Sequence, residues 1–427
     1  MSIGFNTRRL AVGLFCMLTV DWEVEGQEIA GGVDLKGLPA EVADGIRIGN
    51  AGGEKERVVD GKDPVGSGLY FLELIGGDRD LESRLRLRYM EVLLGNGQTS
   101  EADEMAGTIK DYRSEVGRLM VLEKKLILGN APEAREVLEK IGGELGQWKD
   151  WQRTVLRVRL ASVGALAGMS DSEMAAWLAG YDLIGDRMAA VVLAHVQRVR
   201  RGAEFTNEAL KRVMSDGFAE APKVPVPEMV EAAGKLLEVV TGGVGGKRND
   251  EEEKAIFEGI GVLLEKSNAY HADVLLDVAR YFTEQKREAE AKVAFEKAFG
   301  QMGFHLEGGG ERYFKMAEIW KIRGKEKALE GYFEKLEDLA RSQQPMDQPD
   351  GLAWTGACFI MLGAEDKGER LFLEAVRIAA GNPNPRMKYR GCFEVCLCRA
   401  RLGRQMGSEL QDALNAVLRG EVIGVAQ

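Results

Sequence analysis

The chain has 427 residues, of which 45% are hydrophobic, 29% are charged and 7% are aromatic, and its formal net charge is −11. This composition is typical of a soluble chain with a core, and the scarcity of proline and aromatic residues favours helices over strands. The acidic balance argues against nucleic acid and anionic membranes as partners, because both require a basic surface. Three histidines and five cysteines are too few for a metal scaffold built on these residues, and no cofactor is expected.

The N-terminus predicts an export signal. Arg8 and Arg9 precede an apolar run at 10–20, which is shorter than the roughly 20 residues that a membrane-spanning helix needs. We expect cleavage after Gly26, so that residues 1–26 are a signal peptide and the protein is periplasmic or extracellular, with no membrane span after cleavage. A buried N-terminal helix is the alternative.

Helical patterns dominate the rest of the chain. Residues 27–68 are rich in glycine and lack periodicity, so we expect a flexible segment there. From 69 to 240, apolar residues recur at three- and four-residue spacing, which predicts divergent helical hairpins, and no alternating strand pattern is present. A Gly-rich linker at 241–249 separates this part from residues 250–427.

The second half contains an internal repeat. Leu275, Tyr313, Leu352 and Cys392 begin similar segments, and successive segments are separated by 38, 39 and 40 residues. In the first three segments a small residue follows after four positions and an aromatic residue after seven. These residues are Ala279 and Phe282, Ala317 and Trp320, and Gly356 and Phe359. A second aromatic residue follows later in each segment: Phe295, Phe333 and Phe372.

This pattern resembles the tetratricopeptide repeat (TPR) family, whose unit is a helix–turn–helix hairpin. Small residues let the two helices of a hairpin approach closely, aromatic residues fill the space between hairpins, and hairpins stack because none buries its apolar face alone. The resemblance implies an all-α fold, an α-solenoid of TPR-like repeats, and is most specific over 272–380. It also implies a scaffold that binds a protein or peptide partner on its concave face.

The resemblance places six partner-binding residues on that concave face: Arg280, Phe314, Lys321, Ile360, Phe393 and Arg401. They would form an apolar groove flanked by cations. The Lys and Asn residues with which chaperone-binding TPR proteins hold a C-terminal carboxylate are absent from the matching positions, so such a clamp is not expected. As an alternative, the same residues pack against a neighbouring repeat or a C-terminal helix.

Other chemistries have weaker support. Residues 242–247 resemble a phosphate loop but lack its full Gly-x4-Gly-Lys-Ser/Thr pattern, and four acidic residues follow. In an exported protein Cys358 could pair with Cys392, Cys396 or Cys398, although buried core thiols fit their spacing better.

We therefore expect a scaffold rather than an enzyme, because no catalytic motif is present in the sequence. Two rivals remain. One is an all-α enzyme or enzyme-accessory domain acting on an envelope polymer, because acid pairs need no local motif. The other is a self-assembling structural protein, built by repeats that stack between chains.

Overall fold

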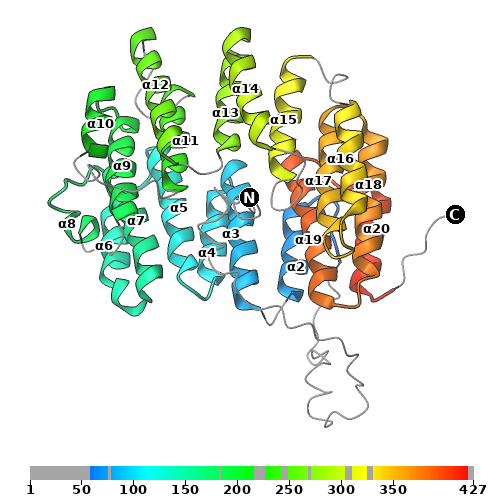
Figure 1. Ribbon diagram of the computed structural model, residues 1–427. Coiled ribbons are helices and arrows are strands. Elements are labelled where there is room, and N and C mark those ends of the chain that lie inside the picture. The colour runs from blue at the N-terminus through cyan, green and yellow to red at the C-terminus, as the bar shows by residue number, and fades with distance from the viewer. Residues whose placement is uncertain are drawn as a thin grey trace, which may run out of the picture.

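The computed structural model describes residues 58–75, 78–179, 181, 184–215, 227–241, 249–267, 271–302, 310–324 and 330–421. Within these ranges all regular structure is helical, which confirms the all-α class (Figure 1). In the same ranges, no helix combines the length and the apolar character needed to cross a membrane. The predicted signal peptide and the phosphate-loop-like residues 242–247 lie outside the described residues.

The helices follow one another in chain order as α2 (Pro64–Leu74), α3 (Arg79–Gly95), α4 (Thr99–Thr108), α5 (Arg113–Ile127), α6 (Ala134–Gly143), the 3-10 helix η3 (Leu145–Gln147), α7 (Asp150–Leu166), α8 (Ala175–Leu178), α9 (Ile184–Arg200), α10 (Asn207–Ser215), α11 (Pro227–Thr241), α12 (Asp250–Ser267), α13 (Ala272–Glu284), α14 (Glu288–Met302), α15 (Gly310–Ile322), α16 (Glu330–Ser342), α17 (Gln348–Met361), α18 (Glu365–Ala380), α19 (Pro385–Leu402) and α20 (Ser408–Leu418).

The helices form two layers. From α3 to α19, every odd-numbered helix contacts the next odd-numbered helix, so these helices make one continuous row. Each even-numbered helix from α4 to α18 packs on at least one member of that row, and α20 packs on α18. The buried apolar side chains form a single cluster that extends from Val59 to Val417.

The row of odd-numbered helices closes on itself. α19 contacts both α2 and α3, which lie at the other end of the described chain, and Figure 1 shows α2 beside α19. The Val59 N–H donates to Asn415 Oδ1 at 2.7 Å, and Met406 N–H donates to the Gly61 carbonyl at 2.7 Å. The two ends of the described chain are therefore joined by backbone and side-chain contacts.

Helix ends follow local sequence signals. In α2 the Asp63 carboxylate accepts from the Gly66 N–H at 2.8 Å, and Pro64 occupies the first turn, where a missing N–H costs nothing. α19 begins in the same way with Asn384 and Pro385. It ends at Leu402 and is followed by Gly403, whose φ of 63° is a left-handed conformation that glycine adopts without strain.

Small residues and aromatic residues pack where the repeat pattern places them. A Cβ added to Gly356 of α17 would lie 2.9 Å from the carbonyl oxygen of Gly368 in α18, so only glycine permits this approach. Between hairpins, the ring centroids of Phe295 and Trp320 are 4.1 Å apart, and those of Phe333 and Phe359 are 6.2 Å apart. These aromatic pairs fill the space between successive helix pairs.

The structure differs from the expected organisation near the beginning of the described chain. Residues 58–68 fall in the segment expected to be flexible, yet Val59 is fully buried and α2 begins at Pro64. The contacts with Asn415 and Met406 order this stretch, and they are too distant in the sequence to leave a local signal. Of the expected linker 241–249, residues 242–248 lie outside the described residues, and the helices before and after it, α11 and α12, pack against each other.

Candidate functional site

Ion pairs join the odd-numbered helices to one another. We call the surface that carries these pairs the inner face. The pairs between neighbouring or more distant odd-numbered helices are Asp277–Lys315, Arg280–Glu318, Asp350–Arg390, Arg88–Glu394, Glu311–Arg401, Arg159–Glu231, Glu123–Arg200 and Glu123–Lys235. Several of these pairs join helices that are not neighbours in the row, as between α5 and α9 or α15 and α19. The row therefore curves tightly enough to bring the charged side chains of these helices together.

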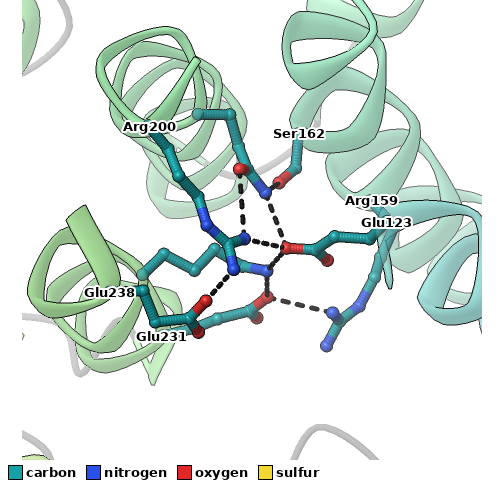
Figure 2. A network of polar contacts seen from close by, with 8 residues as sticks. Glu123, Arg159, Ser162, Arg200, Glu231 and Glu238 are labelled. Atoms are coloured by element: carbon teal, nitrogen blue, oxygen red, sulfur yellow. Dashed lines mark hydrogen bonds and ion pairs between the residues drawn. The ribbon is translucent and has the colours of Figure 1, made fainter. Parts of the chain in front are cut away.

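Glu123 is the centre of one network on this face, which Figure 2 shows. Its Oε1 accepts from Lys235 Nζ of α11, from Arg200 Nη1 of α9 at 2.8 Å and from Gln197 Nε2 at 2.9 Å. Burial alone would raise the pKa of Glu123, but Lys235 and Arg200 outweigh it and hold the pKa at about 2. Glu123 is therefore ionised at every physiological pH.

The rest of this network neutralises its own charge. Arg200 also pairs with Glu238, and Lys235 lies 3.5 Å from Glu231, which in turn pairs with Arg159 at 2.9 Å. Within the network, three cations face three carboxylates: Arg159, Arg200 and Lys235 against Glu123, Glu231 and Glu238. Such a balanced, mostly buried network fixes the positions of four helices and leaves no net charge to attract a ligand.

A small cavity lies elsewhere on the inner face. Its volume is about 30 Å³, room for about one water molecule. Its lining comes from α3, α15, α17 and α19: Arg88, Glu91, Val92, Glu311, Trp354, Leu397 and Arg401. Arg401 pairs with Glu311 at 3.3 Å, and Arg88 makes a bidentate pair with Glu394, whose side chain is only 2% exposed.

Glu91 of α3 and Glu311 of α15 both line this cavity. The side chain of Glu91 is accessible to water although protein atoms surround it densely. Burial, and next the charge of Glu311, raise the pKa of Glu91 to about 7 despite the opposing cations Arg88, Arg159 and Arg401. Glu91 can therefore accept or release a proton near neutral pH, while Glu311 shares the same cavity.

The six residues predicted to bind a partner fall into two groups. Phe314, Ile360 and Phe393 are at most 1% exposed, and Phe393 packs against Tyr89 of α3 with ring centroids 5.5 Å apart. In the structure these three side chains belong to the core, as the alternative packing hypothesis expects.

The three predicted cations are accessible to different degrees. The Arg280 side chain is 48% exposed, Lys321 is exposed, and Arg401 is 25% exposed where it lines the cavity. Arg280 and Lys321 lie near the C-terminal ends of α13 and α15. There the exposed Ile322 and the half-buried Met361 of α17 accompany them. We call Arg280, Lys321, Ile322 and Met361 the rim.

The residues predicted from the sequence do not include the acidic and basic groups that α3, α5 and α11 contribute. Arg88 and Glu91 are three residues apart in α3 between Leu87 and Val92, so charges interrupt an otherwise buried stretch. That interruption was a usable signal, since charges inside an apolar helix pattern are costly without partners. Their partners on α15 and α19 are more than two hundred positions away and could not be read from local spacing.

The cysteines near the C-terminus are free thiols. Cys358, Cys392, Cys396 and Cys398 are all buried, and burial raises the pKa of Cys392 to about 12. They fill core positions, as the favoured interpretation expects, and no disulfide joins them. Within the described residues no three His, Cys, Asp or Glu side chains converge in the way that metal ligands do.

The chain matches no protein-family model, and neither a curated protein nor a solved structure is significantly similar to it. The TPR resemblance therefore stays a prediction that rests on the repeated residues themselves.

Proposed function

We propose that this protein is a TPR-like α-solenoid scaffold and that a protein or peptide partner binds along the rim. The observation that carries the proposal is the continuity of the rim across three successive inner helices. Lys321 Nζ of α15 lies 3.9 Å from Met361 Sδ of α17, and Arg280 of α13 lies 3.7 Å from Glu318 of α15. The C-terminal parts of three neighbouring helices thus bring two cations and two apolar side chains to the rim.

The chemistry of the rim indicates the kind of partner. Ile322 is 46% exposed and offers an apolar contact beside the Lys321 ammonium. A segment that places an apolar side chain next to a carboxylate would complement both, and charged residues at the edge of such a contact mainly set orientation and association rate. The N-terminal halves of the same helices are less suitable, because Phe314 is buried and Asp350 is paired.

The test is affinity capture with the full chain and a matched pair of variants. The rim variant carries Lys321→Glu and Ile322→Asp. The control carries Lys292→Glu and Val293→Asp on α14, where a lysine and an exposed apolar residue are also adjacent. A partner from the native extract that binds wild type and control but not the rim variant supports the proposal. Equal capture by all three would refute the rim as the binding site.

We also propose export as the destination of the chain, supported by the n-region and apolar run at its N-terminus. The intact mass of the protein recovered from its native host gives the test. A chain that begins at Gln27 supports cleavage after Gly26, whereas a chain that keeps residues 1–26 contradicts it.

A second candidate, an all-α enzyme acting on an envelope polymer, has one observation in its favour. Glu91, with a pKa of about 7, shares a cavity with the second carboxyl group of Glu311. General acid–base catalysis uses a proton-carrying carboxyl group beside a second one. Hydrolysis of envelope glycans that disappears in Glu91→Gln, with unchanged helical circular dichroism, would favour this candidate over the scaffold.

A further inference from the structure

Residues 58–75 lie on α19 and α20, the last two helices of the described chain. Besides the bonds from Val59 to Asn415 and from Met406 to Gly61, Gln411 Nε2 donates to the Val59 carbonyl at 2.9 Å. The contacts of α2 with α19 are among the most extensive between any two helices of the described chain. The stretch is thus held by extended backbone contacts at its beginning and by a packed helix at its end.

The surface of α19 that α2 covers is apolar and fits α2 closely. Residues 391–400 of α19 are all buried, because α2 covers the side that α17 and α18 leave open. A Cβ added to Gly68 would lie 3.2 Å from Cys396 Cβ and 2.9 Å from the Tyr89 hydroxyl, so α2 approaches α19 closely here and a small side chain at this position requires only these two side chains to shift. Phe71 packs near Tyr389 with ring centroids 6.4 Å apart.

The same stretch has little contact with its own neighbours in the sequence. α2 contacts α3 far less than it contacts α19, and the Tyr89 hydroxyl of α3 reaches it by donating to the Val65 carbonyl. Its binding site is therefore built by the other end of the chain, 356 positions away at Val59 and Asn415. Only the connection into α3 tethers the stretch to the site it occupies.

We propose that α19 and α20 form a docking site for residues 58–75, and that this site accepts the same stretch from a second copy of the chain. Docking within one chain and docking between two chains use identical contacts. The two states differ in the tether, which raises the effective concentration of the chain's own stretch. Exchange of an identical element is a low-cost route to a dimer, and its population rises with protein concentration. This inference does not depend on partner binding at the rim.

A disulfide trap tests the proposal in the full chain. Gly68→Cys places a thiol next to Cys396, at a Cβ–Cβ separation of 3.2 Å that needs only a small shift to reach the roughly 3.5–4.5 Å of a disulfide. The protein is oxidised over a range of concentrations and separated on a non-reducing gel. Gly68→Cys with Cys396→Ala is the control for links made by other cysteines.

Three outcomes are distinguishable. A linked dimer, twice the 46.9 kDa of the chain, that increases with concentration and is absent from the control supports docking between copies. A linked monomer at every concentration overturns docking between copies and leaves only closure within the chain. The absence of any link to Cys396 overturns the docking geometry itself.

A mixing experiment supplies independent evidence. One full chain carries Phe71→Asp, which puts a charge on the buried face of α2 and prevents its stretch from docking, and the other carries Cys396→Phe, which blocks its surface. In either chain alone, the stretch or the docking surface is defective. In the mixture, the intact stretch of one chain can dock on the intact surface of the other. A dimer by light scattering only in the mixture supports the proposal, and a monomeric mixture of two folded variants overturns it.

Discussion

Glu123 and Glu228 carry the same carboxyl group, yet the pKa of Glu123 is about 2 and that of Glu228 is about 7. Glu123 faces Lys235 and Arg200, which keep its pKa at about 2. Glu228, which is 7% exposed at the start of α11, has its pKa raised to about 7 by burial and then by the carboxylates Glu231 and Asp186. The partner, more than the degree of burial, decides the ionisation state.

Replacing Glu228 by Gln is expected to stabilise the protein at neutral and alkaline pH but not at pH 4.5. Its folded pKa lies above that of the unfolded chain, so its contribution to stability is complete below about pH 4.5 and is lost as the pH rises through about 7. At pH 8 the free energy of unfolding in urea should rise by up to about 3 kcal/mol, and at pH 4.5 it should not change. The exposed Glu139→Gln on α6 is the control. A gain of equal size at both pH values would contradict the assignment.

Removing Glu123 is expected to have the opposite effect. Glu123→Leu leaves Lys235 and Arg200 without their shared carboxylate, and breaking a buried ion pair costs about 3–5 kcal/mol. The double variant Glu123→Leu with Lys235→Met should recover part of this loss, because it removes the unpaired ammonium as well. Urea unfolding of the single and double variants measures the coupling. Additive losses would show that the pair is not coupled.

At the scale of the helix pair, the contacts of one glycine and one arginine show how the repeated segments pack against each other. Gly356 permits the close crossing of α17 and α18. In the fourth segment the position that is aromatic in the other three holds Arg399, whose guanidinium lies 5.6 Å from the Phe372 ring centroid and pairs with Glu369. A cation over the ring thus replaces an aromatic contact between hairpins.

Gly356→Ala is expected to destabilise the protein by about 1–3 kcal/mol, since its Cβ would be forced against the backbone of α18. The matched control is Gly261→Ala on α12, where an added Cβ meets nothing within 4 Å. There alanine should stabilise by about 0.5–1 kcal/mol through its higher helix propensity. Thermal unfolding measures both. Equal shifts for the two variants would mean that the α17–α18 crossing is not tight.

At the scale of the whole molecule, the two ends of the described chain contact each other, and the repeat pattern in the sequence does not predict this contact. The bonds that Val59, Gly61 and Asn415 make connect the two ends of the described chain, and the buried Arg88–Glu394 pair joins α3 to α19. The beginning of the described chain thus covers α19, which would otherwise expose an apolar surface.

Asn415→Ala is expected to loosen the closure locally. It leaves the buried Val59 N–H without its acceptor, at a cost of about 1–3 kcal/mol. Amide hydrogen exchange should increase over residues 58–75 and in α19, and stay unchanged in α7 and α9. Asn207→Ala, which removes an exposed bond to Glu258, is the control. Unchanged exchange over 58–75 would contradict the importance of this bond.

The features that were predicted correctly from the sequence depend on residues that lie close to one another along the chain. Helical periodicity identified the all-α class, and the repeat register located the close glycine contact at Gly356 and the aromatic pair Phe295–Trp320. It placed Phe393 in a binding groove, because nothing local indicates that Tyr89 of α3 covers it. Likewise the cavity combines Glu91 and Glu311, and only the curvature of the whole row brings these carboxyl groups together.

The contact between the two ends of the described chain also determines when α2 can become buried during synthesis. α2 leaves the ribosome early, but Asn415 follows 356 residues after Val59, on the order of 20–70 s later at about 5–20 residues per second. Throughout that interval Phe71 and Leu72, both fully buried in the finished protein, have no surface to cover them. The nascent chain therefore carries an exposed apolar stretch near its start, where a chaperone would bind, until its last helices are made.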